Sequence, residues 1–291
     1  MTKSVQGEVD SLSMAGCDTL LQKKIEGISA MKRSFLSKLH TNGLYYLISA
    51  LLLVAGVPLY QFVVLLPQGY SDALASADQG AFTPYLIWVE NHTGQFLGYR
   101  ALLVIAFAAL ISLPFTLFRI VVAQEILGHE EEDNETDGMP ANAWRGKGFA
   151  VVAAWSGLLG IMLYTLGTLA STTYLFVVSN SFTSHTGIPD NFSAILDILA
   201  VVTNTIGIGL LALSCLFFGA MIARSGRNLW PGIWVAFGYT ALAIAALLSA
   251  SAVAVASTAA GQTPLTTPAT LLFALWVLWF GIMLVRLKPE P

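Results

Sequence analysis

The segment LYYLISALLLVAGVPLYQFVVLL occupies residues 44–66 and contains no charged side chain. A bilayer has a hydrocarbon core of about 30 Å, which a helix of roughly 20 apolar residues can cross. Segment 44–66 is long enough to do so, and Pro67 follows it directly. It therefore predicts a membrane-spanning helix, in which the internal Pro58 is expected to cause a kink.

Five further apolar segments of spanning length follow along the chain. We place the six crossings at about residues 44–66, 97–120, 149–178, 195–222, 231–257 and 269–286. The second apolar run continues to residue 127, and Pro114 divides it. Charged residues make up only 11% of the chain and hydrophobic residues 56%, whereas soluble domains contain about 25% charged residues. The sequence therefore predicts an all-α fold, a polytopic membrane bundle of six transmembrane helices within residues 41–291.

Residues 1–40 form a polar cytoplasmic tail ahead of this domain. From Cys17 to Leu39 the apolar residues of the tail recur at spacings of three and four, which is the period of an amphipathic helix. Lysine and arginine fill much of the remaining face, so we expect a helix that lies on the membrane surface against anionic headgroups. The alternative is a cytosolic helix that docks on another subunit.

Two connections between the crossings are long enough to be structured. Residues 67–96 contain two amphipathic pieces, Tyr70–Asp78 and Phe82–Glu90, whose aromatic side chains suit a re-entrant or interfacial position on the outer side. Residues 128–148 are strongly acidic and resemble the first half of a calcium-binding loop. Trp144 stands where that loop requires a glutamate, so we expect a solvated loop without a metal ion.

The distribution of basic residues predicts the orientation of the crossings. Lysine and arginine are retained in short connections on the cytoplasmic side of a membrane. Of the 14 basic residues, only Arg100 falls on the side opposite to the tail, the acidic loop, the turn at 223–230 and the C-terminus. We therefore expect both termini in the cytoplasm, with the bundle in a bacterial inner or plasma membrane.

Ionisable and amide side chains inside the bilayer are the first candidates for function, because burying them in lipid is costly. Arg100 lies about one turn into the second crossing, and Asp197 about one turn into the fourth. They would form a gate or an ion site, or else a salt bridge that holds the two helices together. Asn204 lies deeper in the fourth crossing, beside Gly207 and Gly209. It would bind a substrate or, as is more common, form a hydrogen bond to a neighbouring helix.

A second group of candidates lies at the outer interface. Glu90 and His92 precede the second crossing, and His185 precedes the fourth. Their spacing is not diagnostic of a metal site, so we expect exposed loop residues and predict no metal. No histidine falls within an apolar run, so we predict no haem and no other cofactor, and a bound lipid is the one ligand left open.

Signatures of known enzyme classes are lacking in the sequence. It contains no GxSxG, HExxH or Walker glycine motif, no paired carboxylates within a crossing and no intramembrane lysine that could hold retinal. The net charge is −3 and no basic patch is found, so nucleic acid is not an expected partner. The sequence favours membrane lipids and other membrane subunits as partners.

Three apolar motifs in the last third of the chain carry a resemblance to a known family. They are GAMIAR at residues 219–224, NLWPGIW at 228–234 and LWVLWFG at 275–281. Together with the six crossings and the long first outer connection, they make the chain similar to a family of bacterial six-helix membrane proteins of unknown function. The resemblance implies six crossings, and it implies no catalytic or binding residue.

Three hypotheses for function follow, in order of preference. The first is a non-enzymatic accessory or scaffold subunit of a membrane complex, because the crossings contain so few polar groups. The second is a transporter or channel for a small or apolar solute, based on Arg100, Asp197 and Asn204. The third is a membrane enzyme that acts on lipid or quinone through the outer-interface residues.

Overall fold

The computed structural model describes residues 37–132, 143–183, 187–255 and 265–287. These residues are almost entirely helical, and no strand occurs among them. Six of the helices within these ranges are long and apolar enough to cross a membrane, which confirms the predicted all-α bundle. We refer to them as the first to sixth spans: Ser37–Gln68, Thr93–Gln124, Gly148–Ser181, Phe192–Arg224, Gly232–Ala254 and Thr266–Val285.

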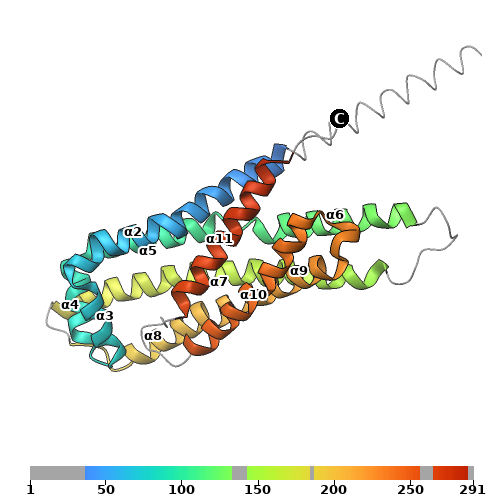
Figure 1. Ribbon diagram of the computed structural model, residues 1–291. Coiled ribbons are helices and arrows are strands. Elements are labelled where there is room, and N and C mark those ends of the chain that lie inside the picture. The colour runs from blue at the N-terminus through green and yellow to red at the C-terminus, as the bar shows by residue number, and fades with distance from the viewer. Residues whose placement is uncertain (1–36, 133–142, 184–186, 256–264, 288–291) are drawn as a thin grey trace, which may run out of the picture.

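Several spans are built from more than one helical element (Figure 1). The first span combines an α-helical start at residues 37–51 with η1 (Leu52–Gly56), α2 (Val57–Tyr60), η2 (Gln61–Leu65) and η3 (Leu66–Gln68). The second is α5 (Thr93–Ala108) followed by α6 (Leu113–Glu132), and the third is α7 (Ala143–Thr183). The fourth joins α8 (Phe192–Ala200), η4 (Val201–Gly207) and α9 (Ile208–Leu229). The fifth is α10 (Gly232–Val255) and the sixth is α11 (Thr266–Val285).

The connection between the first two spans forms two short helices at one end of the bundle, which we call the α3–α4 end. α3 (Tyr70–Asp78) and α4 (Phe82–Asn91) coincide with the two amphipathic pieces expected from the sequence. Gly69 makes the turn into α3 with φ of 79°, a left-handed conformation that glycine adopts without strain. The indole Nε1 of Trp88 donates a hydrogen bond of 2.7 Å to the carbonyl oxygen of Gln68, which ties α4 to the end of the first span.

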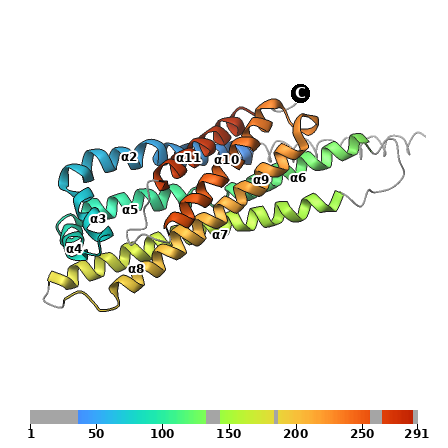
Figure 2. The same ribbon diagram turned by 60° about the horizontal axis from the view of Figure 1, so that its bottom comes forward.

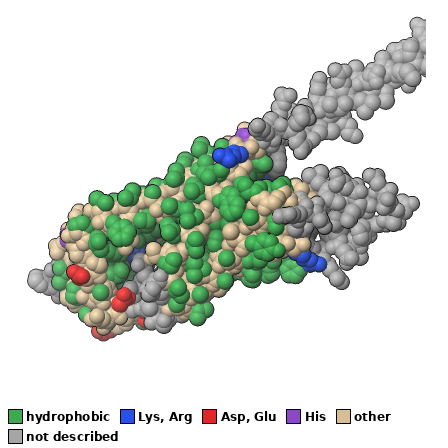
Figure 3. Space-filling model, in the orientation of Figure 1, with side chains coloured by type: hydrophobic (Ala, Val, Ile, Leu, Met, Phe, Trp, Pro, Cys, Tyr) green, Lys and Arg blue, Asp and Glu red, His purple; other side chains and the backbone are tan. Residues whose placement is uncertain are grey.

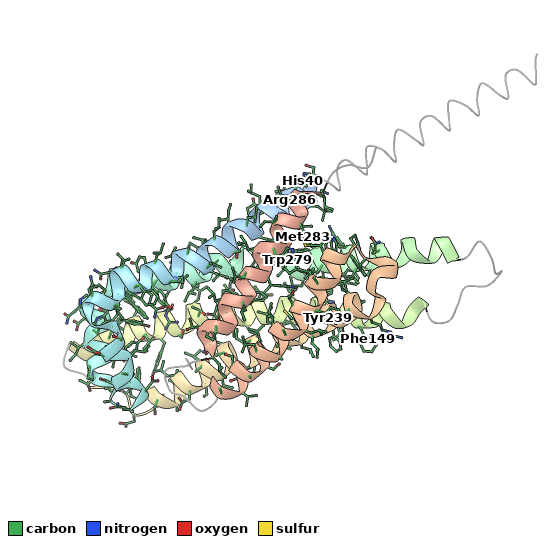
Figure 4. The ribbon with its side chains drawn as sticks, in the orientation of Figure 1. His40, Phe149, Tyr239, Trp279, Met283 and Arg286 are labelled. Atoms are coloured by element: carbon green, nitrogen blue, oxygen red, sulfur yellow. The ribbon has the colours of Figure 1, made fainter. Side chains whose placement is uncertain are left out.

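The opposite end of the bundle holds the start of the first span and the end of the sixth, as Figure 4 shows at His40 and Arg286. There Nε2 of His40 lies 2.8 Å from the carbonyl oxygen of Leu287. At the α3–α4 end the ring centroids of Phe82 and Phe192 are 5.2 Å apart, so the fourth span begins beside α4. Successive spans therefore run in alternating directions along the bundle (Figure 2).

Three details differ from the sequence prediction or extend it. The break at residues 109–112 falls where Pro114 was expected to divide the second run, because proline cannot donate the helical hydrogen bond. The acidic connection is shorter than residues 128–148, since α6 continues to Glu132 and α7 begins at Ala143. Glutamate has a high helix propensity, which favours this continuation. The predicted amphipathic helix at residues 17–39 lies outside the described residues, except for 37–39, which begin the first span.

Glycines allow neighbouring spans to come into backbone contact. A Cβ atom added to Gly160 in the third span would lie 2.7 Å from the carbonyl oxygen of Gly207 in the fourth. A Cβ atom on Gly207 would in turn lie 3.3 Å from the carbonyl oxygen of Gly160. Gly43 and Gly281 form a second reciprocal pair of this kind between the first and sixth spans. Such close approach is an important source of helix association in lipid, where the hydrophobic effect between helices is lost.

The surface of the bundle is hydrophobic along its sides and charged at its ends (Figure 3). Among the side chains that the structure describes, the exposed acidic ones lie toward the α3–α4 end: Asp72, Asp78, Asp190 and Asp197. Exposed basic side chains lie toward the other end: Lys38, Arg119, Arg224 and Arg286. The basic groups therefore share the end at which the first span begins and the sixth span ends.

Candidate functional site

A cavity of about 300 Å³ lies inside the half of the bundle next to α3 and α4. Its wall is formed by α3, α4 and parts of every span except the fifth, namely the first span, α5, α7, α8 with η4, and α11. The lining combines apolar side chains with Arg100, Asn204 and several hydroxyl groups. A volume of this size is at the lower end of the range for small-molecule sites.

The three π-helical segments found in the described part of the chain all border this cavity. η1 and η2 lie on either side of Pro58 and contribute Leu53 and Gln61 to the wall. Proline lacks an amide hydrogen and its ring collides with the carbonyl four residues earlier, so the helix widens around it. η4 contributes Thr203 and Asn204. Widened turns of this kind are frequent at functional sites, because they break the regular hydrogen bonding of the helix.

Arg100 is the charged residue of the cavity, and its guanidinium group faces no described counter-charge. Its Nε is buried and has no hydrogen-bond partner. Cζ of Arg100 lies 5.3 Å from the ring centroid of Phe96, one turn earlier on α5, in a cation–π contact. The other groups near enough for an electrostatic interaction are hydroxyl groups rather than carboxylates, and they belong to Tyr70, Tyr85, Tyr99 and Tyr164.

Asp197 does not pair with Arg100, so the salt bridge considered from the sequence is not formed. The Asp197 side chain is exposed on α8. The helical period explains its position, since the residues of the fourth span that line the cavity recur at spacings of three and four. They are Leu196, Leu199, Ala200, Thr203 and Asn204. Asp197 lies beside this face of the helix and not on it, although its depth in the membrane matches that of Arg100.

Asn204 lines the same cavity as Arg100, so the structure brings these two sequence candidates together. The neighbouring Thr203 has a buried Oγ1 without a hydrogen-bond partner. Gly167 of α7 lies against that hydroxyl, and a Cβ atom at Gly167 would collide with it. A buried polar atom that lacks a partner costs roughly 1–3 kcal/mol.

The tyrosines near Arg100 were not among the sequence candidates. Tyr70, Tyr85 and Tyr99 are buried, and they come from α3, α4 and α5. Burial raises the pKa of Tyr70 well above the usual value for tyrosine, so its hydroxyl stays neutral and cannot neutralise the arginine. Tyrosine counts as apolar in a hydropathy pattern, and for Tyr70 only its spacing of three and seven residues from Ala73 and Ala77 could have indicated an inward position.

The outer-interface candidates do not form a common site in the described structure. His92 stacks on the indole of Trp88 with ring centroids 4.9 Å apart, and its Nδ1 lies 3.1 Å from the Trp88 carbonyl oxygen. Glu90 is half-buried at the end of α4, and His185 lies outside the described residues. Among the described residues, no three histidine, cysteine or acidic side chains are grouped so that they could hold a metal ion.

Comparisons with protein-family models, with curated proteins and with solved structures give no match to this chain. The resemblance to a bacterial six-helix family therefore stays a prediction. The chemistry of the cavity must be judged from its own residues.

The groups that line the cavity are suited to binding a polar ligand. The described residues that line it include no histidine, cysteine, lysine, aspartate or glutamate. They do include a cation, an amide and hydroxyl groups that can donate hydrogen bonds, set among leucine, valine and phenylalanine side chains. This combination fits a molecule with an anionic or strongly accepting polar group and an apolar remainder.

Proposed function

We propose that the protein is a membrane-embedded carrier that binds a small solute with an acidic group in the cavity around Arg100. It corresponds to the transporter hypothesis derived from the sequence. The single observation that carries the proposal is Arg100 in the cavity wall, which has no described counter-charge and whose buried Nε has no hydrogen-bond partner. A charge within a bilayer is costly and usually marks a path for an ion or a solute.

The neighbouring elements support the same function. Thr203 and Asn204 both belong to η4, and both line the cavity. The hydroxyl of Thr203 has no hydrogen-bond partner. π-helical turns in the first and fourth spans border the cavity on two sides. Irregular backbone at membrane depth is tolerated where it lines such a cavity, and transporters use it to coordinate their solutes.

Mass spectrometry of purified protein tests this function directly. We expect wild-type protein, extracted from native membranes in mild detergent, to carry a defined acidic small molecule. Arg100→Gln should lower its occupancy roughly tenfold, because a charge-assisted hydrogen bond is lost. Arg119→Gln is the matched control, since Arg119 is exposed on α6, and it should retain the ligand.

Two results would contradict the carrier. One is wild-type protein that contains no small molecule, and the other is a ligand whose occupancy is unchanged by Arg100→Gln. Protein subunits that copurify in stoichiometric amounts without any ligand would instead support the accessory-subunit hypothesis. That hypothesis and the lipid- or quinone-directed enzyme stay predictions from the sequence.

We also propose that both termini face the cytoplasm, with the protein in a bacterial inner or plasma membrane. The exposed basic residues Lys38, Arg119, Arg224 and Arg286, which share one end of the bundle, support this orientation. Cysteine labelling tests this orientation. Cys17 and Cys215 are first replaced, and a single cysteine is then introduced at position 38 or 190. An impermeant maleimide added to intact cells should label Asp190→Cys, whereas Lys38→Cys should react only after permeabilisation. The reverse pattern would show that the bundle is inverted.

A further inference from the structure

The cavity around Arg100 opens sideways, between the first and sixth spans. Three side chains of its lining, those of Phe62, Thr267 and Leu271, are exposed at the surface of the bundle. Phe62 of the first span is 63% exposed, and Leu271 of the sixth span is 37% exposed. The protein encloses the cavity only in part. The cavity therefore reaches the lateral surface, where a membrane protein meets lipid.

The paths of the two spans account for this opening. They meet at the end that holds His40 and Arg286, where Gly43 and Gly281 bring the backbones into contact (Figure 4). Beyond that point α11 packs against α10 and η1, whereas α2 and η2 of the first span pack against α5. The two spans diverge toward the α3–α4 end (Figure 1). Their separation leaves this side of the cavity uncovered.

The opening lies near the edge of the hydrocarbon core at the α3–α4 end, because the first two spans have 32 residues each, about 48 Å, and the core is about 30 Å thick. Gln61 and Arg100 are each about 10 Å from the end of their span at the α3–α4 end, at about 1.5 Å of rise per residue. The two short helices cover that end and contribute Leu74 and Phe82 to the cavity wall. A molecule dissolved in the bilayer can therefore reach Arg100 from the side, without passing this helical cover.

We propose that the ligand is a single-chain amphiphile with a carboxylate or phosphate headgroup, which enters from the lipid between Phe62 and Leu271. This inference rests on the proposed carrier function and names its solute class. The headgroup accepts a hydrogen bond from Arg100, whose buried Nε has no partner, and Asn204 lines the same cavity. A cavity of about 300 Å³ holds the headgroup and the first carbons of the chain. The rest of the chain lies along the apolar mouth and in the lipid.

Binding to purified full-length protein in nanodiscs of neutral phosphatidylcholine tests the solute class. The probes are decanoate and monodecyl phosphate, with decanol as the uncharged control and acetate and inorganic phosphate as free anions. The rise of the melting temperature with probe concentration gives the affinity. We expect both decyl anions to bind about a hundredfold more tightly than the free anions, which is the gain from burying roughly four methylene groups. Decanol should bind more weakly than decanoate in wild-type protein and equally in Arg100→Gln.

A pair of neighbouring substitutions on α11 tests the route. Leu271→Trp fills the mouth and should weaken decanoate binding about tenfold or more, because a larger side chain competes with the chain of the ligand for the same space. Leu272→Trp is the control, since Leu272 is 45% exposed but does not line the cavity, and it should bind as the wild type does. The comparison of probes in wild-type protein tests the inference even if the Leu271 variant does not fold.

These experiments distinguish the proposed amphiphilic ligand from the carrier function on which it rests. In one outcome acetate and inorganic phosphate bind as tightly as decanoate, and Leu271→Trp binds decanoate as the wild type does. This would contradict the lateral route and would still agree with an anion site at Arg100. In a second outcome none of the probes binds, but the purified protein still carries a small molecule that Arg100→Gln removes. This would contradict an amphiphilic ligand and would still agree with the proposed carrier function. Equal binding of decanol and decanoate in wild-type protein would overturn the role of the headgroup.

Discussion

Gly160→Ala is expected to destabilise the bundle strongly, although it adds a single methyl group. The added Cβ would lie 2.7 Å from the carbonyl oxygen of Gly207 and 2.8 Å from the amide nitrogen of Leu211. Both are backbone atoms, so no side-chain rotation relieves the collision and the third and fourth spans must move apart. Overpacking of this kind costs about 1–3 kcal/mol, and occasionally more.

Gly209→Ala provides a matched control in the fourth span. A Cβ atom at Gly209 meets no other atom within 4 Å. Alanine is favoured over glycine in a helix by roughly 1 kcal/mol, so this variant should be as stable as the wild type or more so. Thermal unfolding in detergent, followed by size-exclusion chromatography, measures both. Equal melting temperatures for the two variants would show that the spans do not meet at Gly160.

A further consequence of this contact concerns the cavity. The third and fourth spans also meet where η4 packs against α7. At this interface Thr203 lies against Gly167. If the spans separate at Gly160, the face of η4 that presents Thr203 and Asn204 moves with them. Gly160→Ala should therefore weaken ligand binding as well as stability, whereas Gly209→Ala should change neither.

The sequence was sufficient for the number of spans and for the two short helices, because both depend on local patterns of apolar residues. All six spans and the elements α3 and α4 overlap the predicted segments. It was also sufficient to single out Arg100 and Asn204, since polar side chains stand out in apolar runs. These predictions needed no knowledge of how the helices pack against one another.

Such knowledge was needed to predict whether Arg100 pairs with Asp197, and the salt bridge expected between them was wrong. Similar depth in the membrane suggested a contact, but depth does not determine which face of a helix turns inward. The face of the fourth span that lines the cavity includes Leu196 and Asn204 and leaves Asp197 exposed. The tyrosines near Arg100 were missed because they count as apolar in a hydropathy pattern, and because Tyr70 and Tyr164 come from elements that are distant from Arg100 in sequence.

Arg100→Met should raise the melting temperature of the ligand-free protein, which is the opposite of what most substitutions of a buried residue do. The guanidinium group has no described counter-charge, and its buried Nε has no hydrogen-bond partner, so the cation–π contact to Phe96 and the nearby tyrosines offset only part of this cost. Replacing buried charges with an apolar side chain of similar volume stabilises some proteins by about 1–4 kcal/mol. Methionine has the length and flexibility to fill the space.

The sign of this effect should reverse when the ligand is present. An anionic headgroup would give the charge of Arg100 a partner, so the wild type gains stability on binding and Arg100→Met does not. Melting temperatures of both proteins, measured after delipidation and again with decanoate, would reveal the crossover. Arg119→Met is the control, because Arg119 is exposed, and it should change little in either condition. If Arg100→Met destabilises the ligand-free protein, the guanidinium group stabilises the fold itself. This result would contradict its proposed role as a binding group for an anion.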